Sequence, residues 1–313
     1  MKTDLSSFRR SSTFYAPKAF LVSVKSFNLK EIRTRYLKSK QRADGRVGSV
    51  ERRALAQGGL VYVELEKGLI SKYEIISFLT EPRGIDAAKD MIAVSSENTI
   101  HVISSNGIDR IDDPWFSYIH TVHFNHRHGA DRLLVSSSGF DCIFEYNLTD
   151  FSRSWEWFAW EHGFQKGFNP QTGKEIMLTR NVREAGSFRK KGMDYLFISD
   201  PEKQALPTAQ RAAFINSVLY DHTRKNTLLA TFFHEGSVYR INMADGSAEK
   251  ILDGLKSPHG GRNYRDHYMA TSTSAGELCF SNGDSISFAG LAGKPPELAG
   301  MEWLQNSAPF EDC

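Results

Sequence analysis

The fold prediction begins with residues 214–252, FINSVLYDHTRKNTLLATFFHEGSVYRINMADGSAEKIL. This stretch contains short runs in which apolar and polar residues alternate, and Gly, Asn and Asp residues separate these runs. Such alternation predicts β-strands, and those residue types are typical of the turns between antiparallel strands. The stretch therefore predicts one unit of four consecutive strands.

Three other stretches, residues 81–112, 118–158 and 257–291, repeat this order of strands and turns. Successive inner strands are expected roughly 40 residues apart, the length of a four-stranded propeller blade, except for one gap about twice as long. The residues that mark these inner strands are Gly84, Val122, Val218, Gly260 and Trp303.

The long gap predicts one further, irregular blade. Its strands are expected at WEHGF (160–164), KEIMLTR (174–180) and DYLFIS (194–199). Six blades result, or five if residues 159–210 are only an insertion. The following segment, PEKQALPTAQRAAF (201–214), is interpreted as a long excursion that forms a lid.

The two ends of the chain are predicted to share a blade. GMEWLQN (300–306) reads as an inner strand with no blade behind it, whereas residues 18–24, 59–66 and 69–76 read as three strands that lack an inner one. Pairing them leaves no open sheet edge. The prediction is an all-β, closed β-propeller that forms a single domain over 1–313. The regular spacing argues against a β-sandwich.

The composition is that of a soluble globular chain. Its 313 residues are 40% hydrophobic and 24% charged, and the longest apolar run falls short of the roughly 18–20 residues that a membrane helix needs. The first residues lack the apolar stretch of a secretory signal. The three cysteines, Cys142, Cys279 and Cys313, are too few for a disulfide framework. A cytoplasmic location is expected.

The net charge of +2 is unevenly distributed. Much of the positive charge lies in residues 29–58, which are predicted to be a basic, partly helical insertion in the first blade. A solvated surface helix and a contact with an anionic partner both explain this segment. Nucleic acid is not expected as a partner, because no nucleic-acid-binding motif accompanies the charge.

The start of each inner strand is the predicted functional position, because a propeller gathers these starts around one mouth of its central channel. Imidazole and amide groups that converge there would bind a divalent transition metal such as Fe, Zn, Cu, Ni or Mn rather than calcium. The candidate metal ligands are His120, His162, Asn216 and His259, with His162 depending on the irregular blade.

Arg83 occupies the same position and favours a second chemistry. A cation beside a metal is unfavourable unless an anion lies between them. Arg83 with the histidines would instead hold a sulfate, phosphate or carboxylate. The candidate catalytic residues are therefore His120, Arg83 and His259, and the candidate substrate-binding residues are Arg83, His234 and Arg211.

The stretch HTVHFNHRH (120–128) contains several closely spaced histidines, but the predicted repeat places them in different elements. His123 is expected to pack between blades. His126 and His128 fall in a predicted turn between strands, where solvated side chains are the expectation.

The blade pattern of residues 60–306 resembles six-bladed propellers of the gluconolactonase and senescence-marker type, NHL-repeat proteins and arylsulfotransferase-like proteins. The first resemblance implies that Asn216 binds a metal. His259 stands where that family has its next acidic ligand, which implies a softer ion than calcium. The arylsulfotransferase-like resemblance implies that His120 handles a sulfuryl group. The short motifs support the fold more than an activity.

Two classes of function follow. The first is an enzyme that acts on a small polar or anionic substrate in the channel, with a metal-assisted hydrolase, lyase or oxidative reaction, or alternatively sulfuryl transfer. The second is a non-catalytic propeller that binds a protein or peptide. An enzyme is expected to keep polar residues at the channel mouth, whereas a binding protein is expected to show an aromatic or charged patch on a rim.

Overall fold

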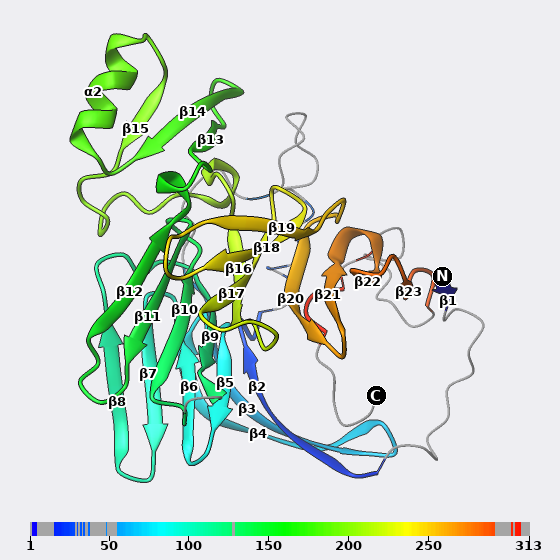
Figure 1. The fold of residues 1–313 in the computed structure, drawn as a ribbon. Coiled ribbons are helices and arrows are strands. Elements are labelled where there is room, and N and C mark those ends of the chain that lie inside the picture. The colour runs from blue at the N-terminus through cyan, green and yellow to red at the C-terminus, as the bar shows by residue number, and fades with distance from the viewer. Residues whose placement is uncertain are drawn as a thin grey trace. The chain divides into compact units, whose positions relative to one another are not determined.

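The computed structural model describes residues 2–4, 16–28, 30, 32, 34, 37, 48, 55–126, 129–291, 302 and 304–307. The fold is all-β, and the strands of the described residues form six separate sheets (Figure 1). The chain divides into two compact units, one of residues 10–212 and the other of residues 1–9 with 213–313.

The unit of residues 10–212 holds four of the sheets. A short helix, α2, and two 3-10 turns, η2 and η3, lie between strands. The elements are β2 (Lys18–Val24), β3 (Gln57–Glu66) and β4 (Leu69–Thr80); β5 (Ile85–Ala88), β6 (Met91–Ser95), β7 (Thr99–Ser104) and β8 (Gly107–Asp112); β9 (Ile119–Phe124), β10 (Arg132–Ser137), β11 (Cys142–Asn147) and β12 (Arg153–Phe158); and η2 (Ala159–Glu161), β13 (Lys166–Asn169), β14 (Lys174–Thr179), α2 (Val182–Lys190), β15 (Tyr195–Phe197) and η3 (Thr208–Gln210).

The other unit holds the remaining two sheets. The short strand β1 joins one of them by parallel pairing with β23. The elements are β1 (Lys2–Asp4); β16 (Ile215–Tyr220), β17 (Thr227–Phe232), β18 (Ser237–Asn242) and β19 (Ala248–Leu252); and β20 (Pro258–Tyr264), β21 (His267–Ser272), η4 (Thr273–Ala275), β22 (Glu277–Phe280) and β23 (Ser285–Ser287).

The four predicted repeats each form four consecutive antiparallel strands, as the alternation indicated. β5–β8, β9–β12, β16–β19 and β20–β23 all follow sequence order across their sheets. In three of them, a Ser or Thr on the second strand also bonds to the first strand or to the residue just before it. Ser95 Oγ accepts from Gly84 N, Ser136 Oγ accepts from Thr121 N, and Thr231 Oγ1 accepts from Ser217 Oγ. This is the meander order of a propeller blade.

Glycine permits a close approach of neighbouring sheets within the larger unit. A Cβ on Gly84 would lie 2.7 Å from the backbone nitrogen of Val122 and 2.8 Å from the Cα of Thr121. Any larger residue at position 84 would therefore push the start of the β5 sheet away from β9.

In the predicted irregular blade, residues 159–210, the structure differs from the prediction at the first expected strand. Residues 160–164 are not a strand, because η2 and a turn occupy this stretch. The predicted strands 174–180 and 194–199 are present as β14 and β15, but β15 pairs in parallel after α2 intervenes. Asn181 begins α2, since its side chain accepts hydrogen bonds from the backbone N–H groups of Arg183 and Glu184. The sheet β13–β14–β15 is therefore a three-stranded, irregular one.

The C-terminal segment was predicted incorrectly as a strand. Residues 302 and 304–306 are in no strand, and Trp303 lies outside the described residues. Leu304 N donates to Thr273 O, and Ser307 Oγ bonds with Thr271 Oγ1, so this segment contacts the β20–β23 sheet of its own unit. Among the described residues, β2, β3 and β4 form a sheet without a fourth strand. Ring closure and the number of blades stay predictions.

The basic insertion lies mostly outside the described residues. Residues 30, 32, 34 and 37 are helical, in agreement with the expected partial helix. The boundary at residue 58 was too late, because β3 already begins at Gln57.

Candidate functional site

The predicted site residues share a backbone position. Two residues before each of them, a non-glycine residue has a positive φ, an uncommon conformation that persists where the surrounding structure enforces it. The φ angles are 42° at Glu81, 50° at Tyr118, 50° at Phe214 and 54° at Ser257. Arg83, His120, Asn216 and His259 therefore hold equivalent places before or within the first strand of their sheets.

Two of these residues are the extra residue of a β-bulge. In the pairing of β9 with β10, Ile119 and Thr121 have partners and His120 is skipped. In the pairing of β16 with β17, Ile215 and Ser217 have partners and Asn216 is skipped. A bulge re-aims a side chain relative to the regular alternation of a strand. Alternation alone would thus misplace both side chains.

Arg83 forms two buried ion pairs. Its Nη1 donates to Glu97 Oε2 at 2.8 Å and its Nη2 to Glu81 Oε2 at 2.6 Å. The Arg83 side chain is 6% exposed and the two carboxylates 2% and 0%. Glu81 also accepts from the backbone N–H of Ala56. An anionic ligand at Arg83 would have to compete with two carboxylates that already hold its guanidinium.

Tyr118 brings a second arginine to this cluster. The Arg83 guanidinium lies 5.2 Å from the centre of the Tyr118 ring and the Arg211 guanidinium 4.4 Å from it. Arg211 is fully buried and donates from Nε to Leu206 O. Burial is the main cause that lowers the pKa of Arg211 to about 10, so the group stays charged at neutral pH. A residue of the predicted lid, 201–214, thus contributes to this cluster.

His120 belongs to the same electrostatic environment. Burial lowers its pKa well below the usual value, and the charges of Arg83 and Arg211 lower it further. The imidazole is therefore neutral at physiological pH. Its Nδ1 lies 2.9 Å from the Tyr118 carbonyl oxygen, which can only accept, so Nδ1 is the donor and Nε2 holds the lone pair. Metal-binding histidines are commonly oriented in this way.

His259 repeats this arrangement in the other unit. Its Nδ1 lies 3.1 Å from the Ser257 carbonyl oxygen and 2.7 Å from Thr273 Oγ1, so Nδ1 again carries the proton. The adjacent Asn216 donates from Nδ2 to Pro258 O at 2.7 Å. Its Oδ1 is buried and has no hydrogen-bond partner among the described atoms. Asn216 thus presents an orphaned oxygen, and it bonds to the residue that precedes His259.

The other two predicted histidines have aromatic neighbours. His162 caps η2 and stacks on Trp157, with ring centres 5.0 Å apart and planes 9° apart. His234 lies after β17 with its ring 5.6 Å from that of Phe214 and 5.4 Å from that of Phe233.

The structure therefore groups the candidates by unit. Arg83, His120 and Arg211 meet at Tyr118 in the unit of residues 10–212. Asn216 bonds to the residue before His259 in the other unit. Convergence of the two groups on one ligand stays a prediction.

Sequence reasoning missed Glu81, Glu97 and Tyr118, which complete the cluster around Arg83. Glu81 and Tyr118 lie within the predicted repeats, two positions before Arg83 and His120. Both have a positive φ, which the sequence does not display for residue types other than glycine. Glu97 lies in the same repeat as Arg83, and only the folded chain shows that its carboxylate pairs with the guanidinium.

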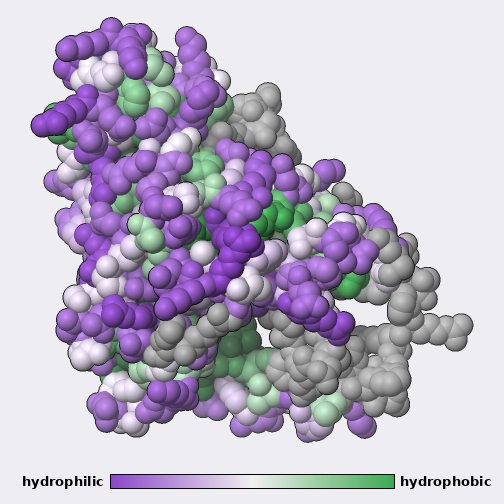
Figure 2. All heavy atoms as spheres, viewed as in Figure 1, coloured by the Kyte–Doolittle hydropathy of each residue, from purple (hydrophilic) through white to green (hydrophobic). Residues whose placement is uncertain are grey.

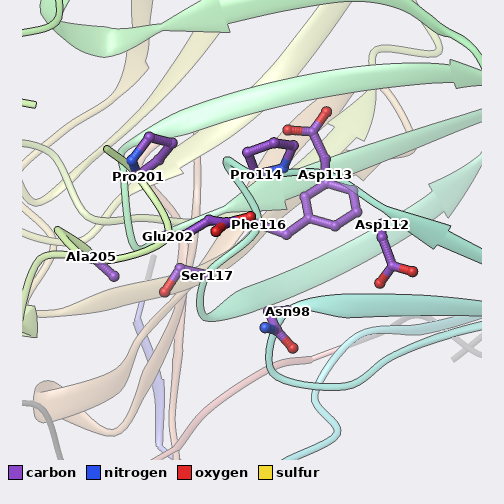
Figure 3. Close-up of a pocket in the computed structure, with 9 residues that line it drawn as sticks. All are labelled: Asn98, Asp112, Asp113, Pro114, Phe116, Ser117, Pro201, Glu202 and Ala205. Atoms are coloured by element: carbon purple, nitrogen blue, oxygen red, sulfur yellow. The ribbon is translucent and has the colours of Figure 1, made fainter. Parts of the chain in front are cut away.

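A cavity of about 340 Å³ lies near the beginning of the 201–214 segment. Figure 3 shows Pro201, Glu202 and Ala205 beside Pro114, Phe116 and Ser117. Its carboxylate Asp113 accepts from Tyr146 Oη at 2.7 Å and from Arg153 Nη1 at 3.1 Å. This carboxylate is already satisfied within the protein and does not point to a ligand.

The sheet β2–β3–β4 has an apolar face that is partly exposed to solvent. Directly opposed residues on neighbouring strands lie on the same face of a sheet. Two apolar rows cross these strands: Phe20, Val63 and Tyr73, and Val22, Val61 and Ile75. We call these six residues the apolar face.

The outer members of the apolar face are exposed although most of the surface drawn in Figure 2 is hydrophilic. Phe20 is 37% exposed, Val22 40%, Ile75 41% and Tyr73 71%. The alternating positions of β4 include Lys72 and Glu74, which are opposed to Glu64 and Tyr62 and so lie on the other face. This sheet is therefore amphipathic with its apolar side uncovered in part.

No protein-family model matches the sequence, and no curated protein matches it. Solved structures with a similar fold include the β-propeller domain of Cps50 (Swd1) from Myceliophteria thermophila (10% identity, TM-score 0.39, 64% of this chain and 50% of that one). Another is the mitotic checkpoint complex, with 8% identity and a TM-score of 0.40, over 77% of this chain and 62% of that one. A third is a protein of unknown function from Bacteroides caccae, with 12% identity and a TM-score of 0.42, over 75% of this chain and 66% of that one. The chain thus spans less than two thirds of each of these structures.

The helices of the described residues are too short and too polar to cross a bilayer.

Proposed function

We propose that the chain is a non-catalytic β-propeller that binds a partner protein through the apolar face of β2–β4. The observation that carries this proposal is the exposure of two apolar rows ending at Tyr73 and Ile75. Exposed apolar patches with polar surroundings are typical of protein-binding surfaces. Aromatic residues such as Tyr73 are enriched among the residues that anchor protein interfaces.

The partner is expected to supply an extended strand. β4 runs over twelve residues, from Leu69 to Thr80, and pairs along one edge with β3. No described strand pairs with its other edge. An extended peptide that adds to such an edge gains backbone hydrogen bonds, while its alternate side chains provide specificity. Alternate apolar side chains of this peptide would extend the two rows beyond Tyr73 and Ile75.

The buried cluster around Arg83 supports the binding role over catalysis at that point. Glu81 and Glu97 already pair with the guanidinium. An active site for an anionic substrate needs cationic groups that the substrate itself can reach. The sulfuryl-transfer alternative therefore receives less support than protein binding.

The test is a selection of displayed twelve-residue peptides on the full chain, followed by binding measurements with the selected peptides. We expect peptides with alternating apolar residues. Tyr73→Lys and Ile75→Lys should each weaken the binding of these peptides by at least about tenfold, the effect of losing an anchor residue of an interface. Glu74→Lys, a substitution on the other face of the same strand, is the matched control and should bind normally.

Three results would contradict the proposal. The first is selected peptides without alternation, and the second is equal binding by the Tyr73→Lys and Glu74→Lys variants. The third is a concentration-dependent dimer that Tyr73→Lys abolishes, which would assign the apolar face to a second copy of the chain. Because Tyr73 is 71% exposed, the Tyr73→Lys variant should unfold at the same temperature as the wild type. An unchanged unfolding temperature would exclude misfolding as the cause of weaker peptide binding.

A metal-dependent channel enzyme is the second candidate. The orphaned Oδ1 of Asn216 favours it, and imidazole and amide side chains such as those of His259 and Asn216 suit a divalent transition metal. Such a metal would polarise a carbonyl or activate water. The metal content of protein purified without added metal tests this candidate: His259→Ala and His120→Ala should each lower it, and metal-free wild-type protein would contradict it.

A further inference from the structure

We propose that Asp86, His123 and His126 form a binding site for a divalent transition metal in the unit of residues 10–212. Neither the predicted channel site nor the apolar face includes these residues. Asp86 lies on β5 and His123 on β9, two strands of neighbouring sheets, and His126 follows β9. The site thus joins two sheets. Asp86 lies three residues after Arg83, and His123 lies three residues after His120.

The three side chains already surround a common point. Asp86 Oδ2 lies 2.9 Å from His123 Nδ1 and 3.1 Å from His126 Nε2. All three candidate ligand atoms lie within 4.8 Å of one another. Metal–ligand bonds of about 2.1 Å at right angles place neighbouring ligand atoms about 3.0 Å apart. The observed separations therefore match two edges of a coordination polyhedron with little rearrangement.

The backbone orients the carboxylate independently of the histidines. The N–H of Phe124 donates to Asp86 Oδ2 at 2.8 Å, and the N–H of Ala87 donates to Oδ1 at 2.9 Å. Such hydrogen bonds from outside the ligand set hold a metal-binding carboxylate in position. Two backbone groups thus hold the Asp86 carboxylate in one orientation between the two histidines.

The donor set selects the metal class. Two imidazoles and one carboxylate suit Zn, Fe, Co, Ni and Mn, whereas calcium takes oxygen ligands. Three protein ligands leave at least one coordination position for water or another ligand. Exposure of the side chains is graded, at 13% for His123, 21% for Asp86 and 40% for His126, so the metal would reach the site from the His126 side.

The ion pair itself is the competing explanation. Without a metal, both imidazoles are within hydrogen-bond distance of one carboxylate oxygen, and this contact links β5 to β9. Metal binding instead requires these nitrogens to direct their lone pairs at the ion. A direct measurement of metal binding distinguishes the two explanations.

The experiment uses the full chain after removal of metals with a chelator. Co²⁺ is added at pH 7.5, its visible absorption is recorded, and Zn²⁺ competition is then measured by calorimetry. We expect a cobalt spectrum with nitrogen ligation and one equivalent of bound metal. His123→Ala and His126→Ala should each weaken Co²⁺ binding by at least about tenfold, the lower range of effects for residues around a metal site.

Two control variants make the result specific. His222→Ala removes a surface histidine of the other unit and should leave the spectrum unchanged. His259→Ala removes the candidate channel ligand, so a loss confined to this variant would assign the metal to the channel and overturn the proposal. Absence of a cobalt spectrum, or equal binding by wild type and both His123→Ala and His126→Ala, would also overturn it. None of these outcomes depends on protein binding at the apolar face.

Discussion

Arg83 and Glu97 form a buried ion pair, with Nη1 of the arginine 2.8 Å from Oε2 of the glutamate. The pair joins the residue just before the first strand of the β5–β8 sheet to the turn between its second and third strands. Arg83 also bonds to Glu81, so one guanidinium forms ion pairs with two buried carboxylates. This arrangement makes Arg83 a structural residue, whatever further role it has.

Replacing Arg83 by Ala is expected to destabilise the fold by about 3–5 kcal/mol, because removal of one partner leaves buried charge unpaired. Urea unfolding monitored by tryptophan fluorescence measures this change. Arg110→Ala is the matched control: its partner Asp112 is 53% exposed, and Arg110 itself 62%. Loss of that surface pair should cost less than about 1 kcal/mol. Similar losses for the two variants would contradict the structural role of Arg83.

Replacing Gly84 by Ala should also destabilise the fold, by about 1–3 kcal/mol, because the added methyl group would overlap the β9 backbone. Gly186→Ala provides the control within the same unit. Nothing lies within 4 Å of a Cβ at Gly186, which is in the middle of α2. Alanine is favoured over glycine by about 1 kcal/mol in a helix, so this variant should be neutral or more stable. Thermal unfolding of both variants checks the contrast.

Asp221→Asn should produce a stability loss that depends on pH. Asp221 Oδ2 accepts from Arg240 Nε, and Oδ1 accepts from Thr223 and Asn263. Burial would raise the pKa of Asp221, but the bonds from Thr223, Asn263 and Arg240 lower it. A lowered native pKa adds stability above the unfolded value of about 3.9, and this stability disappears as the pH falls through the native value.

Urea unfolding at pH 7 and at pH 3 measures this dependence. The Asp221→Asn variant should lose about 1.5–3 kcal/mol at pH 7, the range for hydrogen bonds to charged groups. The difference from wild type should shrink at pH 3. An equal loss at both pH values would show that the carboxylate charge contributes nothing.

Cys142 should resist alkylation in the folded protein. Its thiol is fully buried on β11, and burial with the charges of Asp113 and Asp141 raises its pKa well above the ordinary value. Cys279 is half-buried on β22, and its pKa is also raised, chiefly by burial. Mass spectrometry after brief iodoacetamide treatment should find Cys142 unmodified and Cys279 partly modified. Rapid modification of Cys142 would indicate local opening of the β9–β12 sheet.

Local sequence was sufficient to predict the strands of the regular repeats. Within residues 214–252, alternation and turn residues act over a few neighbouring positions, and β16–β19 follow that pattern. The same reasoning failed at 160–164, because Trp157 and His162 stack across a short 3-10 turn. Nor could alternation locate the bulges at His120 and Asn216, since a bulge depends on the partner strand.

The strand pattern along the chain was enough to predict the repeated units and the equivalent positions of Arg83, His120, Asn216 and His259. These features depend on residue periodicity, which is local and visible along the chain. The partners of individual side chains emerge only in the folded chain, where Glu97 lies beside Arg83 and Asp86 lies beside His123 and His126. The partners come from other strands and turns, up to 40 residues away in sequence for Asp86 and His126. Ion pairing and metal binding depend on distances of a few ångströms, which periodicity does not specify.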